Sequence, residues 1–221
     1  MSHYKIPNSG KGASESNSTE PQILEMSQLL NYLEEKGKLA FGKHFQICRE
    51  DEEVLFKLMV YLFKDKQNAD KYKLDLRKGL MLNGPVGCGK TSLMLLFRQL
   101  AYPGFKFQVV SAREVCIEFM EQGHQVLKYY ASIGQKHPIV FCFDDLGTET
   151  SMKYYGNDVN VMAEILLSRY DLFVQKRIPT HITTNLSASE LEALYGNRVR
   201  SRMREMFNLI AFPQAAGDKR G

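Results

Sequence analysis

The sequence predicts an α/β domain in which helices cover both faces of a mostly parallel sheet. From residue 79 onwards, short apolar runs alternate with amphipathic helical segments, which is the order expected of such a sheet. The run 139–143 is continuously apolar, as is typical of a parallel strand buried on both faces. A glycine-rich turn at 84–89 joins another apolar run directly to a helix. A chain of 221 residues, 44% of them hydrophobic, is long enough to build one such core.

The first 72 residues are predicted to precede the sheet. Residues 1–22 are rich in Ser, Asn, Gly and Lys, so we expect a disordered polar tail there. Apolar residues recur at helical spacing over 23–39, which predicts a helix ending at Gly37, and again over 51–66, where three acidic residues suit the positive end of a helix. The Lys- and Asp-rich run 64–73 is predicted to be a solvated connection.

Residues 23–72 are therefore expected to be helices that lead into an α/β core at 73–221. Within that core, Ser187 and Glu190 match the capping box that opens a helix. The strands expected are 79–82, 105–110, 139–143, 180–184 and 207–212, and the helices are 90–101, 111–121, 158–176, 187–194 and 198–206.

Composition and charge exclude several classes of protein. No apolar run approaches the ~18–20 residues that span a bilayer, and residues 1–12 lack the apolar stretch of a secretory signal. The four cysteines form no C-x-x-C pair, so we expect reduced thiols in a cytoplasmic protein. The net charge of +4 arises within 194–221, which holds six basic and two acidic residues, whereas the rest of the chain holds 23 of each. Such a local surplus requires a local explanation.

Residues 84–91, GPVGCGKT, match the phosphate-loop pattern G-x-x-x-x-G-K-[ST] at every fixed position. Glycines at this spacing let backbone N–H groups surround a phosphate, and the start of the following helix adds a favourable dipole. In this pattern the lysine reaches the β- and γ-phosphate oxygens, and the hydroxyl after it binds Mg²⁺. The expected nucleotide-binding residues are Gly84, Pro85, Val86, Gly87, Cys88, Gly89, Lys90, Thr91 and Ser92. Because Cys88 occupies a variable position, we expect no redox role for it.

Two acids follow the apolar run 139–143. A buried strand that ends in acids delivers carboxylates to its carboxyl-terminal edge. In phosphate-loop ATPases the first acid, here Asp144, holds Mg²⁺ through water, and the second, Asp145, polarises the attacking water. Thr91 and Asp144 are thus the predicted metal residues.

A polar residue, Asn185, follows the strand predicted at 180–184. Open α/β sheets bind ligands at the carboxyl ends of their strands, so we expect Asn185 beside the two acids. There it would orient the attacking water or sense the γ-phosphate. An ordinary turn residue that caps the next helix is the alternative.

The basic surplus lies mainly in the run 195–206, YGNRVRSRMREM. On a helix, Arg198 and Arg202 share one face, and Arg200 and Arg204 share another. Three interpretations stay open from the residues alone: a solvated face, a nucleic-acid contact, or an arginine offered to a neighbouring subunit's γ-phosphate.

The order of these motifs, GPVGCGKT, IVFCFDDLG, HITTN and YGNRVRSRMREM, resembles that of AAA+ ATPases. Within that group it is similar to the DnaC/IstB-type helicase-loader family, over about residues 75–212. The resemblance implies a three-layer P-loop core with a five-stranded parallel sheet, ATP and Mg²⁺ at subunit interfaces, and a homo-oligomer. It also implies no full C-terminal lid, with Arg220 as the candidate second sensor. The catalytic residues that it implies are Asp145, Asn185, Arg202 acting in trans, and Arg198 one turn earlier.

The function implied by this resemblance is that of an ATPase which remodels a replicative helicase or a DNA complex, with low activity in the absence of its partner or oligomer. An IstB-like ATPase that assists a transposase, a small-molecule kinase, and a binding module with little turnover are the alternatives. We expect any contact with single-stranded DNA to be weak and salt-sensitive, because only Arg200 and Arg204 remain for it. The base pocket is assigned to 41–56, which enters the core ahead of the phosphate loop.

Overall fold

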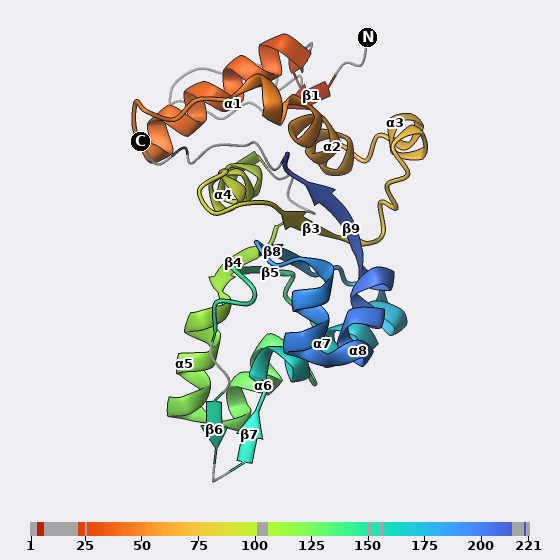
Figure 1. Ribbon diagram of the computed structural model, residues 1–221. Coiled ribbons are helices and arrows are strands. Elements are labelled where there is room, and N and C mark those ends of the chain that lie inside the picture. The colour runs from red at the N-terminus through yellow and green to blue at the C-terminus, as the bar shows by residue number, and fades with distance from the viewer. Residues whose placement is uncertain are drawn as a thin grey trace, which may run out of the picture.

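The computed structural model describes residues 4–6, 22–24, 26–100, 106–149, 152–154, 157–213 and 219. Its centre is a sheet of five parallel strands with helices on both faces (Figure 1). This confirms the predicted three-layer α/β fold. In spatial order the strands are β4 (Gln108–Ser111), β5 (Phe141–Asp144), β8 (His181–Thr184), β3 (Gly79–Asn83) and β9 (Phe207–Ala211).

The strand order brings the ends of three strands together. Asn83, the last residue of β3, pairs with Thr184, the last residue of β8, and β8 in turn pairs with β5. Because all strands are parallel, the segments that leave the carboxyl ends of β3, β8 and β5 start side by side. These are the segments that carry the predicted phosphate loop, Asn185 and the acid pair.

Helices on the two faces bury separate apolar clusters. One face is covered by α1 (Met26–Phe41), α2 (Glu52–Leu62) and α4 (Lys90–Leu100), and the other by α5 (Ala112–Gln122), α6 (His124–Tyr130), α7 (Val161–Lys176) and α8 (Ala188–Met206) (Figure 1). Leu80 and Leu82 of β3 belong to the first cluster, whereas Met81 belongs to the second. Successive side chains of a strand point to opposite faces, which explains the continuous apolar run.

The N-terminal part differs from its prediction in three places. Within the expected polar tail lies β1 (Tyr4–Ile6), and most of the tail lies outside the described residues. This strand pairs antiparallel with β2 (Gln22–Leu24), which takes the place of the start of the helix expected over 23–39. Gly37 does not end α1. It lies inside the helix, where a Cβ would come within 2.2 Å of the Phe45 ring, so close packing accounts for the glycine.

The expected connection at 64–73 contains a helix. A single 3-10 turn, η1 (Arg49–Asp51), leads into α2, and α3 (Lys66–Lys71) follows it. The Asp65 side chain accepts a hydrogen bond from the Asn68 N–H at 3.1 Å and thereby caps α3. The prediction of a solvated connection was wrong because it rested on the charged composition alone, whereas the Asp65 cap stabilises a helix in this segment.

Two elements of the core were not predicted, whereas the two helices expected near its C-terminal end are found. The helix α6 and the hairpin of β6 (Met152–Tyr154) with β7 (Asn157–Val159) have no counterpart in the sequence analysis. The expected helices 187–194 and 198–206 correspond to the two halves of α8, which are separated at Gly196 by non-helical backbone (φ 82°, ψ 159°). The capping box of Ser187 with Glu190 is confirmed at its start. No helix within the described ranges is long and apolar enough to cross a membrane.

Candidate nucleotide-binding site

The phosphate loop follows β3 directly and leads into α4, as the sequence predicts. Gly87 and Gly89 have φ angles of 82° and 95°. Residues other than glycine rarely adopt this left-handed backbone conformation. At Gly84 a Cβ would lie 2.7 Å from the Cβ of Phe212 and 3.1 Å from the Sγ of Cys88. The three glycines are therefore required by backbone conformation and by packing under the loop.

Lys90 is held inside the loop that it ends. Its side chain is buried, and its ammonium donates hydrogen bonds to the carbonyls of Gly84 at 2.8 Å and Pro85 at 2.9 Å. Lys90 is also the first residue of α4, so its charge and the positive end of the helix dipole lie together. This arrangement favours an anion at the mouth of the loop.

Thr91 and Asp144 meet across the sheet edge. The Thr91 hydroxyl lies 3.0 and 2.9 Å from the two carboxylate oxygens of Asp144, and the Thr183 hydroxyl of β8 donates to Asp144 at 2.6 Å. Burial raises the pKa of Asp144, while the two hydroxyl donors and the Lys90 charge oppose that rise. A hydroxyl beside a carboxylate is a donor set that Mg²⁺ prefers. Within the described ranges, no group of three or more His, Cys, Asp or Glu side chains forms a metal site.

Asp145 begins a tight turn after β5. Its φ angle is 52°, and its N–H donates to the Thr183 hydroxyl at 2.9 Å. Thr183 therefore bonds to both members of the acid pair. The Thr148 hydroxyl donates to the Asp145 carbonyl at 2.8 Å, which closes the turn and leaves the Asp145 side chain exposed.

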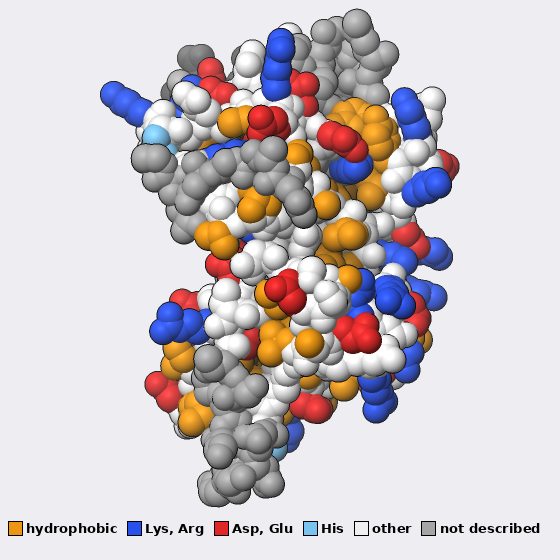
Figure 2. All heavy atoms as spheres, viewed as in Figure 1, with side chains coloured by type: hydrophobic (Ala, Val, Ile, Leu, Met, Phe, Trp, Pro, Cys, Tyr) orange, Lys and Arg blue, Asp and Glu red, His pale blue; other side chains and the backbone are white. Residues whose placement is uncertain are grey.

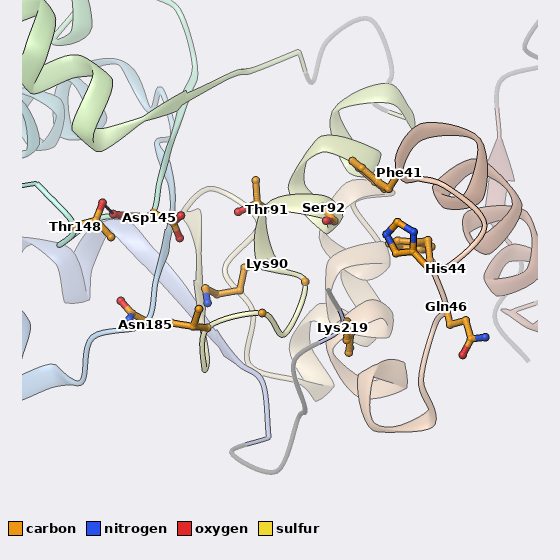
Figure 3. Close-up of a pocket in the computed structure, with 14 residues that line it drawn as sticks. Phe41, His44, Gln46, Lys90, Thr91, Ser92, Asp145, Thr148, Asn185 and Lys219 are labelled. Atoms are coloured by element: carbon orange, nitrogen blue, oxygen red, sulfur yellow. Dashed lines mark hydrogen bonds between the residues drawn. The ribbon is translucent and has the colours of Figure 1, made fainter. Parts of the chain in front are cut away.

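A pocket of about 310 Å³ opens over the loop and gathers most of the predicted residues (Figure 3). Asp145 and Asn185 lie on one side of it, and Phe41, His44 and Gln46 lie on the other. The predicted residues that line it are Val86, Gly87, Gly89, Lys90, Thr91, Ser92, Asp145 and Asn185. The segment expected to hold the base contributes Phe41, His44, Phe45 and Gln46. Asn185 is not the cap of α8, because Ser187 fills that position.

Two further lining residues were missed by the sequence analysis. Thr148 lies in the turn after Asp145, where the sequence shows no motif. Lys219 comes from the C-terminal segment, and its N–H donates to the Gly87 carbonyl at 3.1 Å. Its ammonium forms an ion pair with Asp51, a carboxylate with 4% of its surface exposed. No local signal could have found this contact, because Asp51 and Lys219 lie 168 positions apart in the sequence.

Cys88 packs beneath the loop rather than in the pocket. It is fully buried, and burial raises the pKa of its thiol, which disfavours the reactive thiolate. Together with Cys48, Cys116 and Cys142 it is a free thiol. The expectation that Cys88 has no redox role agrees with this environment.

The second half of α8, residues 197–206, carries the arginines and is called the arginine helix below. It lies far from the pocket of the same chain. Arg202 is five residues before Phe207, the first residue of β9, which pairs with Gly79 at the start of β3, whereas the phosphate loop leaves the opposite end of β3. Arg202 stacks on the Tyr170 ring at 4.2 Å, and its Nη1 donates to the Tyr170 hydroxyl at 3.1 Å. Arg198 is exposed on the same helix. The two arginines therefore do not join Lys90 and Asp145 within one chain.

Basic side chains extend beyond the run 195–206. Figure 2 shows Lys and Arg gathered along the side of the molecule where α3 and α8 lie. Lys78 connects the two regions, because its ammonium donates to the Arg204 carbonyl at 3.1 Å. Arg204 is exposed, but Arg200 is partly buried, with its Nε enclosed. Arg220 lies outside the described residues, and residues 212, 213 and 219, which are described after β9, form no helix.

Comparisons with known proteins agree with this geometry. Residues 80–209 match the model of the ATPase family associated with various cellular activities, AAA. The structure of the DnaC helicase loader is 20% identical, with a TM-score of 0.53, and the match covers 76% of this chain and 92% of the other. A putative primosome component from Streptococcus pyogenes serotype M3 is 18% identical, with a TM-score of 0.54, covering 77% and 83%. No curated protein matches.

These solved structures establish the fold, and the match to the family model establishes membership of the family. The family match spans more than half of the chain and runs from β3 to β9, so it includes the phosphate loop, the acid pair and the arginine helix. The chain therefore belongs to the AAA family of P-loop ATPases, with the fold of the DnaC helicase loader.

Proposed function

We propose that this protein binds ATP with Mg²⁺, hydrolyses it, and uses the cycle to remodel a replicative helicase or a DNA complex. The observation that carries the proposal is the contact of the Thr91 hydroxyl with the Asp144 carboxylate at 2.9 Å, next in the chain to Lys90, whose ammonium is held by the Gly84 and Pro85 carbonyls. The Thr91 and Asp144 side chains both lie at the carboxyl edge of the sheet, where α/β proteins bind nucleotides.

The predicted site residues have roles that their positions in the structure support. The loop N–H groups and Lys90 bind the phosphates, and the exposed carboxylate of Asp145 accepts a proton from, or orients, the attacking water. Asn185 lines the pocket near Asp145 and holds the same water or the γ-phosphate. Mg²⁺ held by Thr91 and Asp144 would neutralise charge on the transferring phosphoryl group.

Hydrolysis requires a second copy of the chain in this proposal. A cation that neutralises the γ-phosphate in the transition state raises the rate of phosphoryl transfer strongly. Arg202 is separated from its own phosphate loop by the length of β3, which supports its action on a neighbouring subunit, with Arg198 beside it. We therefore expect a homo-oligomer, and low activity when the chain is dilute.

The partner is proposed from likeness. The resemblance of the motifs to DnaC/IstB-type loaders and the shared fold support a helicase partner, with a transposase as the other outcome. Exposed Arg204 and the lysines of α3 support a weak contact with single-stranded DNA. The four free thiols suit a reducing compartment such as the cytoplasm.

Nucleotide titration and a trapping experiment test the proposal. Wild type should bind ATP with Mg²⁺ and release free phosphate, and Lys90→Ala should abolish binding. A phosphorylated small molecule in place of free phosphate would establish a kinase instead. An Asp145→Asn variant should keep ATP bound, and its pull-down from the native cell should capture a helicase, whereas capture of a transposase would redirect the cellular role.

A further inference from the structure

Glu149 is a buried carboxylate that bonds to two different parts of the molecule. Its exposed fraction is 9%, its Oε2 accepts a hydrogen bond from the Gly147 N–H at 2.8 Å, and its Oε1 accepts one from the Tyr195 hydroxyl. None of the ion pairs found among the described residues includes Glu149. A buried carboxylate with only neutral donors is less favourable than an apolar side chain of the same volume, so packing alone does not explain Glu149.

The first part is the turn that carries Asp145. Gly147 has a φ angle of 102°, and a Cβ there would lie 2.3 Å from the Leu186 side chain, so the turn is tightly confined. Leu146 is fully buried, and its N–H donates to the Thr183 carbonyl at 2.8 Å. The bond from Gly147 to Glu149 closes the turn only two residues after Asp145, so a shift of Glu149 moves the backbone that presents the Asp145 carboxylate.

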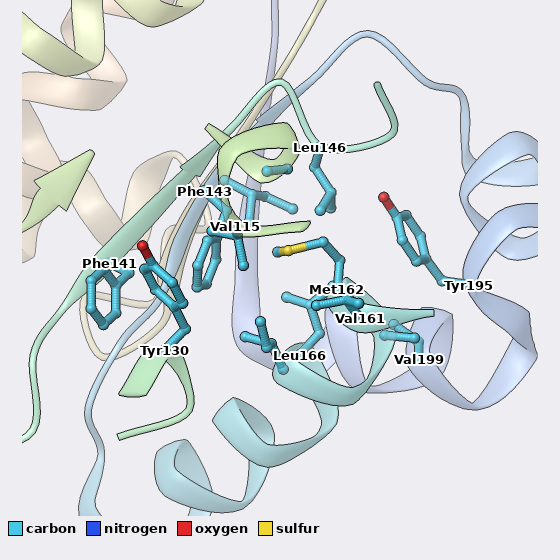
Figure 4. Close-up of a cluster of buried hydrophobic side chains, with 14 of the residues drawn as sticks. Val115, Tyr130, Phe141, Phe143, Leu146, Val161, Met162, Leu166, Tyr195 and Val199 are labelled. Atoms are coloured by element: carbon cyan, nitrogen blue, oxygen red, sulfur yellow. The ribbon is translucent and has the colours of Figure 1, made fainter. Parts of the chain in front are cut away.

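The second part is the kink of α8. Tyr195 is buried and immediately precedes Gly196, where the helix changes direction. In Figure 4 the Tyr195 ring projects from α8 with its hydroxyl toward the loop of Leu146. Burial and the Glu149 carboxylate raise the pKa of Tyr195, so the hydroxyl retains the proton that it donates. The Leu194 carbonyl also accepts a hydrogen bond from Asn160 at 2.8 Å, which fixes the helix from the other side.

Beyond the kink, α8 carries the arginines. Val199 and Met203 are buried and set the rotation of this half of the helix, which leaves Arg198 and Arg202 on its outer side. The orientation of the arginines therefore depends on the point at which Tyr195 is held.

We propose that Glu149 and Tyr195 are positioning residues that couple the Asp145 turn, which acts on the nucleotide of its own chain, to the arginine half of α8, which acts on the nucleotide of a neighbour. The bond transmits a displacement of the turn to Arg198 and Arg202 without either residue touching nucleotide. This inference rests on the proposed function for its catalytic meaning, and on the two hydrogen bonds of Glu149 for its geometry.

Tyr195→Phe tests the coupling, because it removes the hydroxyl and keeps the buried ring. Amide hydrogen exchange should rise at least fivefold both in 145–149 and in 197–206, and the ATPase kcat should fall at least tenfold while the Kd for ATP stays within twofold. Glu149→Gln should act in the same direction. The double variant should be no worse than the more impaired of the two single variants, since one bond is being removed.

Tyr130→Phe is the matched control. Tyr130 is also buried and also donates to a glutamate, Glu118, at 3.0 Å, and its ring packs against Phe141 and Phe143 of β5. It should alter neither the exchange of the two segments nor kcat. Exchange that rises in 197–206 alone after Tyr195→Phe would overturn the coupling, as would a wild-type kcat. If the wild type itself fails to hydrolyse ATP, the proposed function fails, and the exchange measurement still decides the coupling.

Discussion

The ammonium of Lys219 forms an ion pair with the carboxylate of Asp51, and this contact joins the C-terminal segment to the residue that ends η1. Asp51 is buried, whereas the Lys219 side chain is 23% exposed and lines the pocket over the phosphate loop. The same lysine bonds to the Gly87 carbonyl through its backbone N–H. One residue thus ties Asp51, which follows the pocket-lining residues Phe41 to Gln46 in the chain, to the phosphate loop.

Replacing Lys219 should destabilise the fold and weaken nucleotide binding. Lys219→Ala leaves Asp51 buried without a cation, so we expect the free energy of unfolding to fall by about 1–3 kcal/mol, less than for a fully buried pair because Lys219 is partly exposed. The double variant Asp51→Asn/Lys219→Ala should recover part of that loss. Urea unfolding followed by circular dichroism measures both. Lys57→Ala, which breaks the pair with Glu53, a carboxylate 71% exposed, is the control and should change stability by less than about 1 kcal/mol.

We expect the Thr183 hydroxyl to be needed for ATP hydrolysis, because it positions the two acids Asp144 and Asp145. Its hydroxyl donates to Asp144 and accepts from the Asp145 N–H, and Thr183→Val removes both bonds at nearly constant volume. Residues that orient a metal-binding carboxylate typically contribute about 10–100-fold, so we expect kcat to fall by that factor and the Mg²⁺ requirement to rise. Thr183→Ser keeps the hydroxyl and should restore most of the rate. Equal rates for Val and Ser would show that the hydroxyl is not used.

Replacing Arg202 should lower the rate of ATP hydrolysis, whereas replacing Arg204 should not. Arg202→Ala should leave ATP binding within twofold and lower kcat by about 10³-fold or more, the range known for an arginine that neutralises the γ-phosphate in trans. Arg204 lies on the same helix but on another face, and Arg204→Ala should hydrolyse ATP normally. Steady-state phosphate release at several protein concentrations measures both. A wild-type rate for Arg202→Ala would refute the trans assignment.

Mild acid should destabilise the protein through His181. This residue is fully buried, its Nδ1 accepts the Leu80 N–H at 3.1 Å, and burial lowers its pKa to about 3. The unfolded chain takes up a proton near pH 6.5, so stability is complete above that pH and is lost progressively as the pH falls from 6.5 toward 3. Between pH 7 and pH 5 we expect a loss of about 2 kcal/mol from this residue.

The variant His181→Gln isolates that contribution. Its amide oxygen can accept the same N–H without titrating, so its unfolding free energy should depend less on pH than that of the wild type over this interval. His44→Gln alters an exposed histidine and should retain the wild-type slope. Equal slopes for all three proteins would contradict a role for His181.

Local patterns predicted the phosphate loop and the strands around it because each depends on neighbouring residues. Gly89 of the phosphate-loop pattern adopts a positive φ angle, and the apolar run before Asp144 is buried. The prediction that α1 ends at Gly37 was wrong because this glycine is explained by close packing against the Phe45 ring and not by the end of its helix. The helix at α3 was missed for the related reason that one cap, Asp65, outweighed the charged composition around it.

The sequence by itself determined the class of fold, the phosphate loop, the acid pair and the position of Asn185, because these follow from local backbone conformation and from the alternation of strands and helices. Only the tertiary structure decided that Thr183 serves both acids, that Lys219 reaches Asp51, and that Glu149 joins the Asp145 turn to Tyr195. These contacts link residues that lie far apart in the sequence and meet only in the folded chain, and no spacing along the chain records which distant side chains meet.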